Sequence, residues 1–72
     1  MAVKKLLLKD VNEKFRERRL PHIVKTRQDP MYGRVYTLYE YHEDGMFPIT
    51  ESTDLTDLMI KTGLGDLFGL SY

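Results

Sequence analysis

Few side chains of this 72-residue sequence could carry out catalysis. It contains no cysteine, which excludes disulfides, thiolate metal sites and cysteine nucleophiles. Its histidines are His22 and His42, and its serines, Ser52 and Ser71, lie at a predicted helix start and next to the last residue. The glycines within residues 63–69 follow a predicted helix, whereas a phosphate-binding loop precedes one. We therefore predict a protein without enzymatic activity, cofactor or metal ion.

Charge is the most informative global property of the sequence. The net charge is zero, but residues 1–36 carry ten Lys or Arg against four Asp or Glu, which gives +6. Residues 37–72 carry one against seven, which gives −6. Either the two halves fold so that their opposite charges face each other, or the basic half forms a face for an anionic partner.

A first helix is predicted over residues 10–20. Asp10 and Glu13 have the spacing of a capping box at its start, and Val11 and Phe15 lie one turn apart on its apolar side. Pro21 should end it, because the residue before a proline avoids the helical region.

Three antiparallel strands are predicted next, over residues 22–27, 34–42 and 46–50. The middle strand is rich in Val, Thr and Tyr, and Asp44-Gly45 is typical of a hairpin turn. Pro48 cannot donate a ladder hydrogen bond, so the last strand should lie at a sheet edge.

A second helix should begin near Ser52 or Thr53 and end at Gly63, with a buried stripe of Leu55, Leu58 and Met59. The predicted fold is a single α+β domain over residues 1–72: a helix, a three-stranded antiparallel sheet and a helix, with both helices on one sheet face. Residues 3–8 form either a short extra N-terminal strand or an early part of the first helix. Residues 64–72 form a glycine-punctuated apolar tail.

The middle strand has two different faces. Alternation places one set of residues on the predicted core face: Val35, Thr37, Tyr39 and Tyr41. The other face carries Arg34, Tyr36, Leu38, Glu40 and His42. Either the second helix or the tail covers Tyr36 and Leu38, or these two residues and Arg34 form a contact patch for a protein partner.

The order helix, three strands, helix resembles that of double-stranded RNA-binding domains, which implies an RNA partner. Those domains carry a basic motif at the start of the final helix, where this chain has the acidic segment 50–54. Nucleic acid would therefore have to contact the first helix and the strands, through Arg16, Arg18, Arg19, Lys25, Arg27 and Arg34.

The tail contains Asp66-Leu67-Phe68, which resembles the end of the peptide by which bacterial proteins bind the DNA sliding clamp. The upstream Gln and Leu of that peptide are absent, because Leu64 and Gly65 stand in their places. The alternative is that the apolar residues of the tail fold back and enlarge the core.

The leading hypothesis is a non-enzymatic protein-interaction module, a small adaptor or inhibitor of the kind that bacteria and their phages encode. Nucleic-acid binding is the first alternative, and self-association into a homodimer that completes the sheet at an edge is the second. We expect a cytoplasmic protein without a membrane partner. The apolar run Leu6–Leu8 is too short for a secretory signal, and no stretch is long enough to span a membrane.

Overall fold

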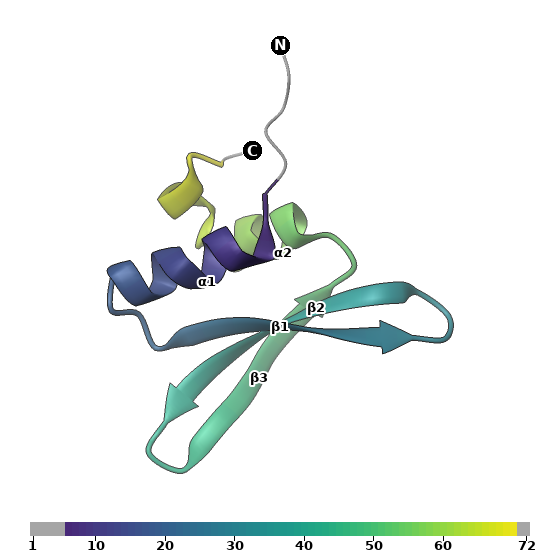
Figure 1. Ribbon diagram of the computed structural model, residues 1–72, viewed down its shortest axis with the longest axis horizontal. Coiled ribbons are helices and arrows are strands. Elements are labelled where there is room, and N and C mark those ends of the chain that lie inside the picture. Colours follow the sequence, from purple (N-terminus) through teal and green to yellow (C-terminus); the bar gives the residue numbers. More distant parts are fainter. Residues whose placement is uncertain (1–5, 71–72) are drawn as a thin grey trace.

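The computed structural model describes residues 6–70 and confirms the predicted α+β fold, with two helices above one three-stranded antiparallel sheet (Figure 1). The elements are α1 (Leu8–Glu17), β1 (His22–Asp29), β2 (Gly33–His42), β3 (Gly45–Ser52), α2 (Leu55–Lys61) and the short 3₁₀ helix η1 (Gly65–Phe68). The strand order is β1-β2-β3, so β2 is central. Within residues 6–70, no helix is long and apolar enough to cross a membrane.

Helix α1 differs from the prediction at both ends. It starts at Leu8, and Leu7 precedes it without a side-chain cap, so the predicted capping box at Asp10 is wrong. The helix ends at Glu17 because Arg19 adopts the left-handed conformation with φ of 55°. The N–H of Leu20 then donates to the carbonyl of Phe15 at 2.9 Å, which closes the helix before Pro21 is reached. Of the proposed N-terminal strand, residues 3–5 lie outside the described part of the chain.

The sheet agrees closely with the predicted strands. The β2–β3 hairpin turns at Glu43 and Asp44, and Gly45 has a φ of 127° that few other residues adopt. Pro48 lies on the edge strand β3, as predicted. A bulge in β3 falls where the register shifts between Leu38 and Tyr39 of β2.

One residue on each edge strand of the sheet is capped by a side chain from a helix. On β1, the N–H and C=O of Val24 point away from β2, and the amide of Asn12 binds both, at 2.8 and 3.0 Å. On β3, the ammonium of Lys61 donates to the backbone carbonyl of Glu51 at 2.6 Å. These caps occupy edge groups that would otherwise be free to pair with another strand.

Helix α2 has Asp54 as its N-cap, one or two residues after the predicted caps Ser52 and Thr53. The Asp54 carboxylate accepts hydrogen bonds from the N–H groups of Thr56 and Asp57 at 2.8 and 3.3 Å. Ser52, one of the predicted caps, instead accepts a hydrogen bond from the N–H of Asp54. Gly63 ends the helical region in the left-handed conformation, as predicted.

The core lies between the helices and one face of the sheet. Its buried members come from α1, β1, β2 and α2: Val11, Phe15, Val24, Leu38, Leu55, Leu58 and Met59. The apolar residues of the tail pack against this cluster, and the ring of Phe68 meets that of Phe15 edge-on at 6.4 Å. The tail therefore folds back and enlarges the core.

The predicted core face of β2 is wrong, because the face of Tyr36 and Leu38 is the one beneath the helices. Leu38 is 1% exposed and Tyr36 packs against the core cluster. Val35 is also buried, yet it does not belong to that cluster. The cause lies in β1, where Val24 pairs with Leu38 and enters the core.

We expect Leu38→Ala to lower the free energy of unfolding by about 2–5 kcal/mol, because it leaves a cavity beneath the helices. Tyr41→Ala, on the opposite face and 48% exposed, should lower it by less than about 1 kcal/mol. Urea denaturation followed by circular dichroism measures both values. A larger loss from Tyr41→Ala would contradict the observed assignment of the two faces.

Candidate protein-interaction surfaces

The contact patch predicted at Arg34, Tyr36 and Leu38 does not form a free surface. Arg34 is exposed, but Leu38 is buried and Tyr36 is half-buried against the core. The structure agrees with the alternative interpretation, in which other elements cover this face. A contact surface must therefore be sought elsewhere.

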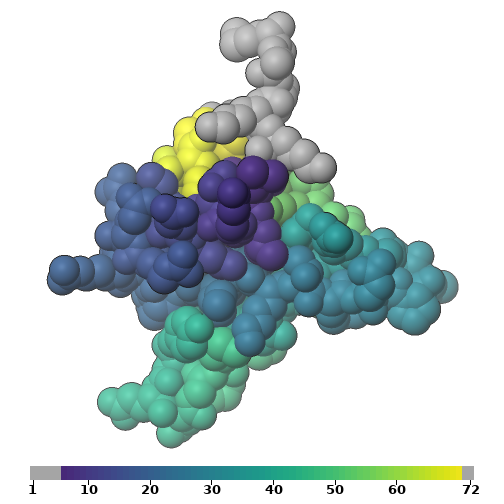
Figure 2. Space-filling model, in the orientation of Figure 1, coloured from purple at the N-terminus to yellow at the C-terminus, as the bar shows by residue number. Residues whose placement is uncertain are grey.

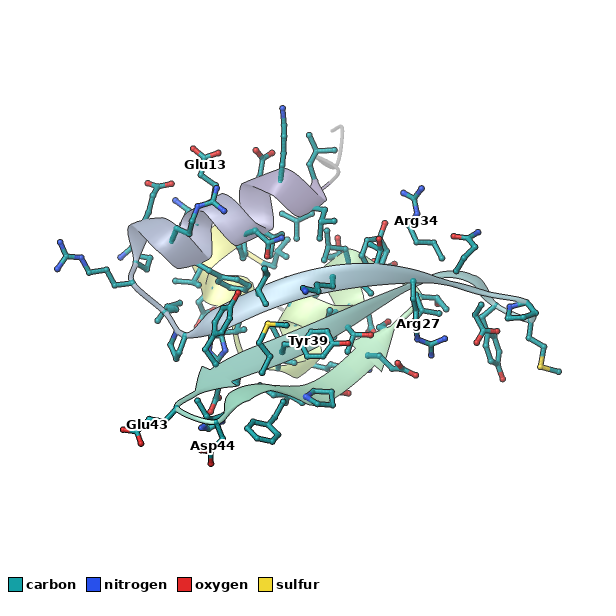
Figure 3. All side chains as sticks on the ribbon, turned by 60° about the horizontal axis from the view of Figure 1, so that its bottom comes forward. Glu13, Arg27, Arg34, Tyr39, Glu43 and Asp44 are labelled. Atoms are coloured by element: carbon teal, nitrogen blue, oxygen red, sulfur yellow. The ribbon has the colours of Figure 1, made fainter. Side chains whose placement is uncertain are left out.

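The six basic residues proposed for nucleic-acid binding lie in three places. Three of them lie at the C-terminal end of α1, where a positive charge interacts favourably with the helix dipole: Arg16, Arg18 and Arg19. Lys25 and Arg27 project from β1 on the side away from the helices. Arg34, at the far end of β2, points to the opposite side from Arg27 (Figure 3). One flat anionic partner could not contact all six together.

The sheet face opposite the helices is uncovered by any described element, and we call it the open face (Figure 3). Cross-strand pairs place side chains from all three strands on it. They are Ile23, Lys25, Arg27, Val35, Thr37, Tyr39, Tyr41, Met46, Pro48 and Glu51. This face divides into a charged end and an aromatic end.

At the charged end, the guanidinium of Arg27 joins a carboxylate of its own strand, β1, to a carboxylate of β3 on the other side of the central strand. It donates to Asp29 at 3.1 Å and to both carboxylate oxygens of Glu51 at 3.1 Å. The hydroxyl of Thr37 also lies 3.4 Å from Glu51. Because Val35 is the cross-strand neighbour of Arg27, this bridge passes over it, which explains why Val35 is 3% exposed outside the main core. The bridge also links the basic half of the sequence to the acidic half.

The same network fixes the turn between β1 and β2. The second carboxylate oxygen of Asp29 accepts hydrogen bonds from the N–H groups of Met31 and Tyr32 at 2.8 and 3.1 Å. These two bonds, and then the bond from Arg27, stabilise the charged form and lower the pKa of Asp29 below its ordinary value. Pro30, which lies between Asp29 and Met31, restricts the backbone of this turn further.

We call residues Pro30–Tyr32 the hairpin tip. Met31 and Tyr32 are 84% and 69% exposed, more than any other large apolar residue in the described part of the chain. The hairpin that carries them projects away from the helices as a separate arm (Figures 1 and 2). From the sequence this segment is predicted to be a turn, in which Tyr32 could supply a ring for base stacking if the basic half binds nucleic acid; a projecting apolar tip is not predicted. The available signal was the presence of two large apolar residues between Pro30 and Gly33, where polar residues are usual.

The other end of the open face is apolar and aromatic. Tyr41 is 48% exposed, and Tyr39 beside it is half-buried. Ile23 and Met46 are also half-buried, and Pro48 is exposed on the edge strand. We call these five residues the aromatic patch. Tyrosine and methionine are enriched in protein interfaces, and the charged end of the face supplies a polar border.

A cleft with a volume of about 440 Å³ lies on the helix side of the sheet. It is lined by His22, Leu38, Glu40, Ile49, Thr50, Lys61, Thr62 and Leu64. The ring of His22 packs edge-on against Phe15, and its buried Nδ1 has no hydrogen-bond partner. Among residues 6–70, no three His, Cys, Asp or Glu side chains come together as a metal site.

Comparisons with protein-family models, curated proteins and solved structures found no match for this chain. The geometry of its own residues is therefore the basis for the functional proposals.

The lowered pKa of Asp29 leads to a prediction for the pH dependence of stability. A carboxyl group whose pKa is lower in the folded than in the unfolded state stabilises the fold at pH values above its unfolded pKa. This contribution is lost as the pH falls through the folded pKa. The difference in free energy of unfolding between the wild type and Asp29→Asn, measured by urea denaturation, should be the same at pH 7 and at pH 5. At pH 3 the difference should be smaller. An equal difference at all three pH values would contradict the role of the charged carboxylate.

Proposed function

We propose that this protein is a non-enzymatic protein-interaction module, an adaptor or inhibitor, that inserts its hairpin tip into an apolar pocket of another protein. The observation that carries the proposal is the pairing of high exposure with a fixed backbone at Met31 and Tyr32. These two large apolar side chains are exposed to solvent, and hydrogen bonds from their N–H groups to Asp29 fix the loop that carries them.

Fixing the loop favours binding. A flexible loop loses conformational entropy when it binds, whereas a loop already held by hydrogen bonds loses little. Asp29 holds the two N–H groups of the tip, and Arg27 holds Asp29 to Glu51 on the far strand. The tip is therefore ordered before a partner is met, as in complexes whose interface backbone moves little on binding.

The residue types also fit a protein pocket. Tyrosine is among the residues that most often dominate binding energy, and methionine adapts its shape to an apolar cavity. Asp29 is already paired with Arg27, while Arg34 is exposed at the base of the tip with no ion pair among the described residues. We therefore expect the partner's pocket to be apolar and bordered by carboxylates. The absence of cysteine is compatible with a cytoplasmic location.

The test compares the double variant Met31→Ser/Tyr32→Ser with Phe47→Ser. Phe47 is an exposed apolar residue of β3, so its replacement is a matched control away from the tip. Because all three side chains are largely or half exposed, both variants should keep the wild-type stability within about 1 kcal/mol. Proteins captured from a cell lysate by the wild type are identified by mass spectrometry, and the affinity of each purified partner is measured by calorimetry.

We expect at least one partner to bind the tip variant more than about tenfold more weakly than the wild type, with Phe47→Ser unchanged. If every captured protein binds the tip variant and the wild type equally well, the hairpin tip is not the contact surface.

A further inference from the structure

We infer that a second copy of this chain occupies the aromatic patch, with two open faces packed together about a two-fold axis that runs parallel to β2. This inference goes beyond the proposed function, because the hairpin tip takes no part in the contact. It differs also from the sheet-edge association that the sequence suggested. The edge groups of Val24 and Glu51 are already bonded to Asn12 and Lys61, whereas the open face is uncovered.

The charges of the open face fit this symmetry. A two-fold axis along the central strand places β1 of one copy over β3 of the other. Lys25 and Arg27, on β1, then face Glu51 of the second copy. An in-plane axis perpendicular to the strands would instead place β1 over β1 in the opposite direction, so Lys25 would not face Glu51 of the second copy. Lys25 forms no ion pair among the described residues of its own chain, so it is available for this contact.

The aromatic side chains fit the same arrangement. Tyr39 and Tyr41 project from β2, the strand nearest the axis, so each lies close to the tyrosines of the second copy. Aromatic pairs of this kind contribute energy beyond the area that they bury. Ile23 from β1 and Pro48 from β3 both pair with Tyr39 and flank it on either side. The sheets should cross at about 30°, because each sheet is twisted.

The size of the face sets the expected affinity. Three strands about 4.8 Å apart, each about 26 Å long, make a face at the small end of specific protein interfaces. We therefore expect a dissociation constant in the micromolar range, about 1–100 μM. Because the axis is parallel to β2, both hairpin tips would extend from the same end of the dimer. A dimer could then bind two sites on one partner assembly.

Sedimentation velocity of the purified chain, at concentrations from about 1 to 500 μM, tests the inference. We expect the mass to rise from the monomer value of 8.5 kDa toward twice that value. Tyr41→Glu, at a half-exposed position near the axis, brings two like charges together and should remain monomeric and folded. Met31→Ser/Tyr32→Ser should dimerise like the wild type.

A charge exchange identifies the arrangement of the copies. Lys25→Glu alone and Glu51→Lys alone should each weaken the dimer about tenfold or more, because like charges then meet across the axis. An equimolar mixture of the two variants should recover the dimer, since the carboxylate introduced on β1 of one chain then faces the ammonium introduced on β3 of the other. A chain that stays monomeric up to about 500 μM, or a dimer that Tyr41→Glu leaves intact, would overturn the inference. So would a mixture that shows no recovery. None of these results would test the hairpin tip, whose variants are assayed separately.

Discussion

The structure depends on one constraint: two short helices can cover only one face of the sheet. α1, α2 and the tail lie above the same face, and the main core forms there between Val11, Phe15, Leu38 and their neighbours. The opposite face must then be stable in contact with water. It meets this requirement with the Arg27 bridge over Val35 at one end, while the tyrosines at the other end stay partly exposed.

The Arg27 bridge connects stability to the proposed function. Its bond to Glu51 ties the two edge strands together across β2, and its bond to Asp29 supports the carboxylate that holds the hairpin tip. Each ion pair is largely exposed, so its separate contribution to stability is small. Its main consequence is geometric, because the guanidinium holds the Asp29 carboxylate that bonds the backbone of Met31 and Tyr32.

The elements could be predicted from the sequence because alternation, turn residues and Gly63 act locally. The assignment of the β2 faces failed because alternation in one strand does not say which side faces the helices. The missing signal was present in β1, where Lys25 and Arg27 alternate with Val24. A strand with cations on one side places its other side in the core, and pairing carries that choice to Leu38. The edge cap by Asn12 depends on a tertiary contact, and Arg19 takes the left-handed conformation that glycine usually supplies at a helix end, so neither had a comparable local signal.

The most direct test is site-specific photocrosslinking in cells, with a benzophenone amino acid placed in turn at Tyr32, Tyr41 and Glu13. Glu13 is exposed on α1, on the side of the helix away from the sheet (Figure 3). If the side of the sheet away from the helices and the tip form the binding surfaces, the probe at Tyr32 and Tyr41 should give protein adducts and the probe at Glu13 should give none. Adducts from Glu13, with none from the other two positions, would place the partner on the helices and contradict this conclusion.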